Sequence, residues 1–373
     1  MRAGKSWKPR RRRTANRLVA RLSYLASTYS APMSTAWRCM FLMLAVVTLS
    51  AESGEAEQPV APRDAARDRT SAFAATVQDL PADERAQRIV AWFAAQDTSL
   101  GKIAAIGMIN DRYVTVVPPA IVTDLVAPLL SDPDVDVRTC AAQALPPEAC
   151  EAHGDKLERL LTEPAFEAKE AALHAMGRSG APRFAIVIAA RMRDADPRVR
   201  IAAAWGWRWY VDNASRALVP LLRDSDPEVR RAAAQDLGPS LGRSGEAVQE
   251  ALFHALDDAD ARVRAAAVTS LTWSRDALSR LLPLAGDADR DVRAAVAQAI
   301  GAVGNFYTAR ELEPLLRDPE AHVRYHALTT ALNLRNATLR PAVEALTADP
   351  HRSIRDRLVE PATRAVKWLE APP

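Results

Sequence analysis

A basic residue recurs along most of this chain at an almost constant interval. The successive intervals are 31, 31, 30, 34, 29, 31 and 31 residues. A period near 31 residues held over eight copies predicts a solenoid, in which stacked units contact mainly their neighbours. The eight positions are Arg138, Lys169, Arg200, Arg230, Arg264, Arg293, Arg324 and Arg355.

Two other positions keep a fixed place relative to each basic residue. An apolar side chain directly precedes it: Val137, Ala168, Val199, Val229, Val263, Val292, Val323 and Ile354. An acidic side chain stands six residues before it: Asp132, Glu163, Asp194, Asp224, Asp258, Asp287, Asp318 and Asp349. Because these residues recur in every unit, we interpret the acid and the base as structural and not as catalytic carboxylates and bases.

The unit around Arg200 shows how one repeat folds. Asp196 followed by Pro197 predicts an N-cap and a first helical residue, and the helix should run to about Tyr210. At 100° per residue, one face carries small or apolar residues and is predicted to be buried: Val199, Ala202, Ala203 and Gly206. The other face carries Ile201, Trp205 and Arg208.

A second apolar helix is predicted before each acidic turn. The apolar stretches are Leu218–Leu222, Leu252–Leu256, Leu278–Leu284 and Leu312–Leu316. One repeat is therefore a helix, a tight Asp/Pro turn and a second helix. Neither helix can bury its apolar side alone, so the units must stack.

The stretch Leu-Val-Pro-Leu-Leu-Arg-Asp-Ser-Asp-Pro-Glu-Val-Arg-Arg-Ala-Ala-Ala at 218–234 resembles HEAT repeats, including the phycobilin-lyase-like kind. The resemblance extends over about residues 120 to 365. It implies an all-α fold, a right-handed superhelical solenoid of about eight helix-turn-helix repeats. It also implies a hydrogen-bonded ladder between units, made by Asp132, Arg138, Asp194, Arg200, Asp224, Arg230, Asp258, Arg264, Asp287, Arg293, Asp318, Arg324, Asp349 and Arg355.

The chain before the array divides by composition. Residues 1–32 form an Arg-rich leader, read either as a transit peptide or, preferably, as an over-called start with initiation at Met33. Residues 33–54 resemble a signal peptide, with an apolar stretch at Cys39–Leu49 and small residues after it. We predict a linker at 55–70, an N-terminal helical cap at 71–119, and the repeat array with its C-terminal cap at 120–373.

The signal-like segment predicts export to a periplasm or to the cell exterior. Its apolar stretch is short for a membrane span, so we expect no span in the mature form, although an uncleaved anchor remains the alternative. Ten of the 49 basic residues and one of the 46 acidic residues lie in 1–54, which leaves 39 basic and 45 acidic residues in the remainder. A net charge of −6 argues against a nucleic-acid partner.

The sequence indicates no catalytic chemistry. There is no Gly-x-x-x-x-Gly-Lys or Gly-x-Gly-x-x-Gly motif, and no Cys-x-x-Cys. Cys140 and Cys150 are read as small core residues, with a disulfide as the alternative. His322 and His326, four residues apart, could share a metal ion with an acid, but the spacing alone is weak, so no metal or cofactor is predicted.

The leading functional hypothesis is a non-enzymatic scaffold that binds another protein on its concave face. Five residues after the basic residue, the other repeats carry polar side chains, whereas the unit at 194–210 carries Trp205. An exposed aromatic residue beside an arginine is typical of a binding hot spot. The predicted partner-binding residues are Ile201, Trp205, Arg208, Trp209 and His174. The alternative is a lyase-like enzyme or ligand carrier whose cleft is lined by Trp205, Trp209 and His174.

The signal-like segment leads to the first testable prediction. Cleavage after its small residues should leave a mature N-terminus between about residues 50 and 57. N-terminal sequencing of the protein purified from its own host measures this directly. A product that retains Met1 in the cytoplasm would contradict both the cleavage and the export.

Overall fold

The computed structural model describes residues 62–110, 117–210, 214–241, 246–303 and 306–359. Within these ranges the chain is helical and contains no strand. It divides into two compact units, Met1–Asp68 and Arg69–Pro373, and the whole repeat array lies in the second. The leader and the signal-like segment predicted for 1–54 lie outside the described residues. No helix in the described part is long and apolar enough to cross a bilayer.

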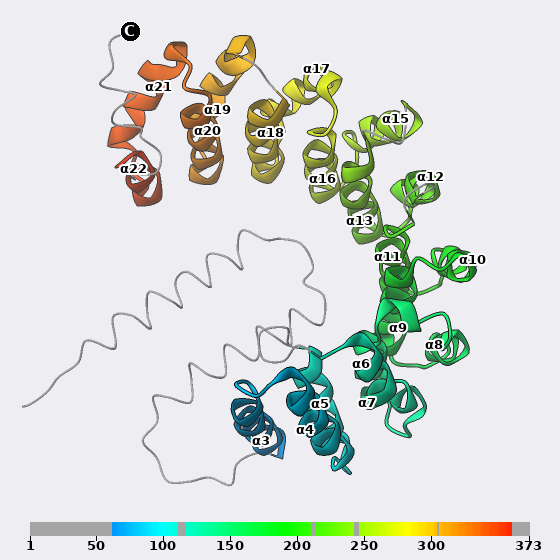
Figure 1. Cartoon of the computed structure of the whole chain (residues 1–373). Coiled ribbons are helices and arrows are strands. Elements are labelled where there is room, and N and C mark those ends of the chain that lie inside the picture. The colour runs from blue at the N-terminus through cyan, green and yellow to red at the C-terminus, as the bar shows by residue number, and fades with distance from the viewer. Residues whose placement is uncertain (1–61, 111–116, 211–213, 242–245, 304–305, 360–373) are drawn as a thin grey trace, which may run out of the picture. The chain divides into compact units, whose positions relative to one another are not determined.

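Eight helix-turn-helix repeats follow one another, as predicted. Their first helices are α6 (Pro119–Val126), α8 (Gly154–Leu160), α10 (Pro182–Arg191), α12 (Ala214–Leu218), α15 (Glu246–Ala255), α17 (Leu278–Leu281), α19 (Glu313–Leu316) and α21 (Arg340–Ala345). Their second helices are α7 (Val135–Ala144), α9 (Phe166–Ser179), α11 (Pro197–Trp207), α13 (Pro227–Leu237), α16 (Ala261–Leu271), α18 (Arg290–Val303), α20 (Ala321–Leu334) and α22 (Arg352–Val359). From α8 onward, Figure 1 shows the first helices along one side of the array and the second helices along the other.

Several first helices are shorter than predicted and end in a 3-10 turn. The stretch Leu218–Leu222 divides between the end of α12 and the 3-10 helix η3 (Val219–Arg223). Leu278–Leu284 divides in the same way between α17 and η6 (Leu282–Gly286). In both cases a proline stands in the first turn of the 3-10 helix, where it cannot donate to the preceding helical turn.

The array opens earlier than the eight copies predict. Helix α3 (Pro62–Val77) begins inside the linker predicted for 55–70, which is therefore wrong from residue 62 onward. Proline is tolerated at a helix start and the segment is rich in alanine, so its polar composition does not prevent a helix. Helices α4 (Ala82–Ala94) and α5 (Ser99–Asn110) follow, and α5 packs against α7 as one second helix packs against the next.

The turn between the two helices uses both of its acidic residues. In the third repeat, Asp194 accepts from the backbone N–H of Asp196 at 3.0 Å, which closes an Asx turn. Asp196 then caps α11 by accepting from the backbone N–H of Arg198 at 2.9 Å. Pro197 occupies the first turn of the helix, so the predicted start of the second helix is confirmed.

The ladder joins the base of one repeat to the acid of the next. Arg200 donates from Nε and Nη2 to the two carboxylate oxygens of Asp224, at 2.8 and 2.7 Å. Its third nitrogen, Nη1, donates to the backbone carbonyl of its own repeat's acid, Asp194, at 2.9 Å. The same fork joins Arg230 to Asp258, Arg264 to Asp287, Arg293 to Asp318 and Arg324 to Asp349.

The ends and one interior step of the ladder depart from this fork. Arg138 reaches Glu163 through Nη2 alone. Lys102 of α5 donates to Asp132 at 2.7 Å and so extends the ladder to an opening repeat that the basic period did not include. Lys169 and Asp194 form no ion pair within the described part of the chain. An ammonium group cannot provide the planar two-bond fork of a guanidinium.

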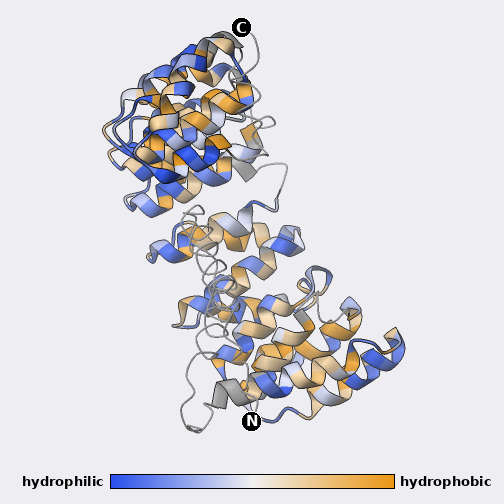
Figure 2. Cartoon of the chain, turned by 90° about the vertical axis from the view of Figure 1, so that its left-hand side faces the viewer, coloured by the Kyte–Doolittle hydropathy of each residue, from blue (hydrophilic) through white to orange (hydrophobic). Residues whose placement is uncertain are grey.

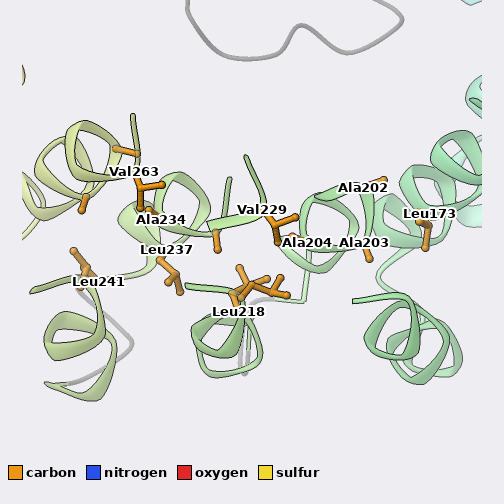
Figure 3. Close-up of a cluster of buried hydrophobic side chains, with 14 of the residues drawn as sticks. Leu173, Ala202, Ala203, Ala204, Leu218, Val229, Ala234, Leu237, Leu241 and Val263 are labelled. Carbon is orange, nitrogen blue, oxygen red and sulfur yellow. The ribbon is translucent and has the colours of Figure 1, made fainter. Parts of the chain in front are cut away.

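Small buried residues let neighbouring second helices pack closely. All eight apolar residues that directly precede the basic positions are buried, from Val137 to Ile354. Ala202, Ala203 and Gly206 are buried as predicted. Figure 3 shows Leu218 of α12 pointing toward Val229 of α13 and the alanines of α11. Figure 2 shows that the helices carry both hydrophobic and hydrophilic residues, as expected of helices with one buried side.

The ladder produces a stability prediction. Arg230→Ala removes the fork to Asp258 and the bond to the Asp224 carbonyl, and both groups are largely shielded from water. We expect the free energy of unfolding to fall by about 1–3 kcal/mol, as for hydrogen bonds to charged groups. Urea unfolding followed by far-ultraviolet circular dichroism measures the loss. Arg223→Ala is the control, because Arg223 is exposed and lies outside the ladder; equal losses in the two variants would contradict a structural ladder.

Candidate functional site

Trp205 lies on the exposed side of α11, against a side chain of the preceding repeat. Its ring centroid is 5.8 Å from that of His174 on α9, with the two planes tilted by 37°. Both residues are half-buried. Ile201, one turn earlier on α11, is half-buried and packs against the core. The equivalent residues elsewhere are Gln143, Gln235, Thr269, Gln298 and Thr329, so this junction places two rings where the other repeats have polar chains.

A close approach of α9 and α11 brings these two rings together. A Cβ atom at Gly177 of α9 would lie 2.7 Å from the Cα of Gly206 on α11. A Cβ atom at Gly206 would lie 2.8 Å from the backbone oxygen of Leu173. Only glycine permits backbones this near. Since Leu173 adjoins His174 and Gly206 adjoins Trp205, the same approach sets the distance between the two rings.

The second helix of this repeat ends earlier than predicted. It stops at Trp207, with Arg208 as its C-cap residue, and not near Tyr210. The Tyr210 hydroxyl donates to the backbone oxygen of Ala181 at 2.9 Å, which anchors the chain to the turn before α10. Trp209 consequently lies in the turn after the helix, where its side chain is 54% exposed.

Trp207 packs in the opposite sense to Trp205. It lies against the core and its ring is 5.5 Å from that of Tyr210. Its indole Nε1 is shielded from solvent and has no hydrogen-bond partner among the described residues. Because Trp207 packs against the core, it serves as a structural control for Trp205.

Two guanidinium groups act on His174. Arg178 donates from Nη2 to the backbone oxygens of Gln143 and Leu145, near the end of α7. Arg208 is exposed and makes no hydrogen bond or ion pair with any described residue. Burial, followed by the charges of Arg178 and Arg208, lowers the pKa of His174 to about 4. The ring beside Trp205 is therefore neutral at pH 7, and Arg208 is the available positive charge.

Asp236 on α13 is a residue of this region that sequence reasoning missed. Its Oδ2 is shielded from water and has no hydrogen-bond partner within the described residues. Burial raises the pKa of Asp236 to about 6, and the positive charges of Arg208 and Arg231 limit the rise. At this position, six residues after the basic one, six of the other seven repeats have Ala, Gly, Ser or Thr, and the last has Pro361. An acidic residue at a position that otherwise carries small residues was the sequence signal that could have pointed to Asp236.

The equivalent residue of the next repeat indicates what Asp236 faces. Ser270 on α16 is buried and donates from Oγ to the backbone oxygen of Ala234, on the preceding second helix, at 2.7 Å. By the same register, we expect the Asp236 carboxyl to point toward the backbone of the preceding second helix, α11. A carboxylate cannot donate to a carbonyl, whereas a protonated carboxyl can.

Trp273 is a second residue that the sequence reading passed over. It is 65% exposed and lies in the turn after α16, nine residues after Arg264. Trp209 stands nine residues after Arg200, in the turn after α11. This shared spacing from the basic residue could have revealed Trp273 in the sequence. Trp273 offers a matched exposed tryptophan at the same place in another repeat.

The described residues offer no recognisable catalytic centre. No disulfide joins Cys140 and Cys150, so the predicted alternative of a disulfide is wrong for this structure. Burial raises the pKa of the Cys150 thiol to about 11. No three His, Cys, Asp or Glu side chains of the described ranges are arranged to hold a metal ion as they stand. The residues Gly238-Pro-Ser-Leu-Gly242 match the sequence pattern of a nucleophile elbow, but Gly238–Ser240 form a 3-10 helix directly after α13, whereas a nucleophile elbow follows a strand.

Comparison with known sequences supports the repeat assignment. The family model described as HEAT repeats matches residues 122–208, 215–279 and 278–360, which is more than half of the chain. No curated protein sequence matches the chain.

Solved structures with a similar arrangement share little sequence with this chain. The Escherichia coli protein YibA is 16% identical, with a TM-score of 0.46, and the match covers 76% of this chain and all of that one. The karyopherin Kap121p, bound to the extreme C-terminus of the phosphatase Cdc14p, is 16% identical with a TM-score of 0.44, and the match covers 78% of this chain and 39% of the karyopherin. The CpcE–CpcF complex of phycocyanin lyase from Nostoc is 19% identical with a TM-score of 0.36, and the match covers 66% of this chain and 96% of the lyase chain.

Asp236 gives a pH-dependent prediction. Its folded-state pKa of about 6 lies above the ordinary value near 3.9, so its favourable contribution is complete below about pH 4 and is lost as the pH rises through 6. Asp236→Asn keeps the shape and supplies a donor. It should raise the free energy of unfolding by about 1–2 kcal/mol at pH 7.5 and change it little at pH 4.5.

Urea unfolding at the two pH values checks this prediction. The control is Asp257→Asn, which removes an exposed carboxylate from the turn after α15. A stabilisation of Asp236→Asn that is equal at both pH values would show that the carboxyl is not protonated in the folded state near pH 4.5.

Proposed function

The chain belongs to the HEAT-repeat family, and we propose that it is an exported, non-enzymatic scaffold that binds another protein on the face of its second helices. HEAT-repeat proteins commonly bind proteins, and a row of stacked helices offers an extended surface for a partner. The observation that carries the proposal is the junction of α9 and α11, where Trp205 and His174 replace the polar pairs of the other repeats.

The chemistry of this junction favours a partner with an apolar side chain and an acidic group. Ile201, Trp205 and the neutral His174 provide a half-buried apolar surface. Arg208 is exposed beside them without a carboxylate partner in the described residues. A carboxylate of the partner can bind the guanidinium fork while an apolar side chain covers the indole. Trp209, exposed in the following turn, extends the surface.

Export rests on the signal-like segment at 33–54. An exported scaffold would meet its partner outside the cytoplasm. We therefore propose that the partner is a protein of the envelope or of the cell exterior. The competing function, a lyase-like enzyme or ligand carrier, would reveal itself through a small molecule that copurifies with the chain or through turnover.

The test begins by identifying the partner with a site-specific crosslinker. A photoreactive side chain at position 208 should crosslink one stoichiometric protein from the envelope fraction, while the same group at position 223, also exposed, should not. Isothermal titration calorimetry with that partner then compares variants. We expect Trp209→Ala to weaken binding by roughly 2 kcal/mol without altering the melting temperature, since the ring is largely exposed.

Three matched variants sharpen this experiment. Trp273→Ala removes another exposed tryptophan two repeats away and should leave affinity unchanged. Trp205→Ala should weaken binding and lower the melting temperature less than Trp207→Ala, whose indole packs against the core. Equal losses of affinity for Trp209→Ala and Trp273→Ala would contradict a site centred on α11. Equal destabilisation by Trp205→Ala and Trp207→Ala, with unchanged affinity, would mean that Trp205 only fills space.

A further inference from the structure

Two histidines meet on the second-helix face at the junction of α18 and α20. His322 and His326 stand one turn apart on α20, and their ring centroids are 4.6 Å apart with the planes at 81°. His322 is exposed and His326 is half-buried. Helix α18 adds two polar side chains: Gln298 lies 2.8 Å from Nδ1 of His326, and Asp291 Oδ1 lies 3.6 Å from Nε2 of His322.

Two imidazoles on successive turns of one helix can bind the same metal ion. The four-residue spacing puts both on one face, and first-row divalent ions bind imidazole nitrogen at about 2.0–2.1 Å. Two such ligands of one tetrahedral ion have nitrogens roughly 3.3 Å apart. Rings whose centroids are already 4.6 Å apart reach this separation by side-chain rotation, without movement of the helix.

Gln298 provides the support that a metal-binding histidine needs. A ligating histidine usually donates its other ring N–H to an oxygen, which fixes the tautomer. The amide of Gln298 can present its oxygen to Nδ1 of His326, because the two ends of an amide group are interchangeable in shape. His326 then donates from Nδ1 and keeps the Nε2 lone pair free for a metal ion.

We propose that His322 and His326 chelate a divalent transition-metal ion such as Zn²⁺ or Ni²⁺, with Gln298 holding His326 in the binding tautomer. The protein supplies two ligands, since no third donor converges with them in the described residues. Water fills the remaining positions on this exposed face, or a side chain of a bound partner takes one of them. Neutral imidazole suits Zn²⁺, Ni²⁺ and Cu²⁺ and does not suit Mg²⁺ or Ca²⁺.

The surrounding charges favour a cation here. Asp291 lies beside His322, and its Oδ1 is also 3.6 Å from Nε of Arg290. Arg290 is in turn 3.9 Å from Glu320, so the two carboxylates together exceed the charge of the one guanidinium.

The test is calorimetric titration of the purified full chain with ZnCl₂ and NiCl₂, each alone, at pH 7.5. We expect one ion to bind per chain, and we expect its binding to require both His322 and His326. His322→Ala and His326→Ala should each weaken that binding at least tenfold, and Gln298→Ala should weaken it less. His322 is exposed, so its variant should keep the melting temperature of the wild type. His254→Ala, which removes an exposed histidine of α15, is the control and should bind as the wild type does.

Two outcomes would overturn the proposal. One is the absence of measurable binding to the wild-type chain. The other is unchanged stoichiometry and affinity in the His322→Ala/His326→Ala double variant, which would place any bound ion elsewhere, for example on the cysteine thiols. The proposal does not depend on the partner site at α11, and its test uses the metal ion alone.

Discussion

The forked bond between an arginine of one repeat and an aspartate of the next is the interaction on which this array depends. Each guanidinium binds forward through Nε and Nη2 and backward through Nη1, as Arg200 does with Asp224 and with the Asp194 carbonyl. The Arg230 guanidinium in turn lowers the pKa of the Asp258 carboxyl, so the pair remains ionised at neutral pH. A planar fork accepts only one relative placement of two turns, and it therefore sets the register between neighbouring repeats.

The one interior step without an ion pair is also the step where the candidate site lies. Lys169 does not pair with Asp194 in the described structure, and this is the junction between the repeats of α9 and α11. Direct backbone packing holds the same junction, since Gly177 and Gly206 let the two helices approach. That approach places the His174 ring against Trp205. Backbone contact therefore sets the relative position of α9 and α11 at this junction. The side chains of His174 and Trp205 are not needed for that purpose and are available to bind a partner.

Departures from the repeat pattern gather around that junction. Trp205 replaces a polar residue, and Asp236 on the next helix replaces a small one. The positive charge of Arg208 acts on the preceding helix and on the following one. It lowers the pKa of His174 on α9 and limits the rise of the pKa of Asp236 on α13. A side chain that repeats in every unit serves the architecture. Those that break the repeat are free to serve a partner, and this reasoning also applies to His322 and His326 in the seventh repeat.

The sequence by itself determined the eight periodic repeats, their buried positions and the cap of α11, because each depends on residues within one unit. Asp196 caps α11 and Val199 is buried whatever the neighbouring repeat contains. Only the tertiary structure decided which acid each arginine binds, since that partner belongs to another unit. It also decided that α11 ends at Trp207, because Tyr210 bonds to Ala181 in the turn between α9 and α10. The environment of Asp236 and the contact of Gln298 with His326 arise in the same way, between helices that stacking alone brings together.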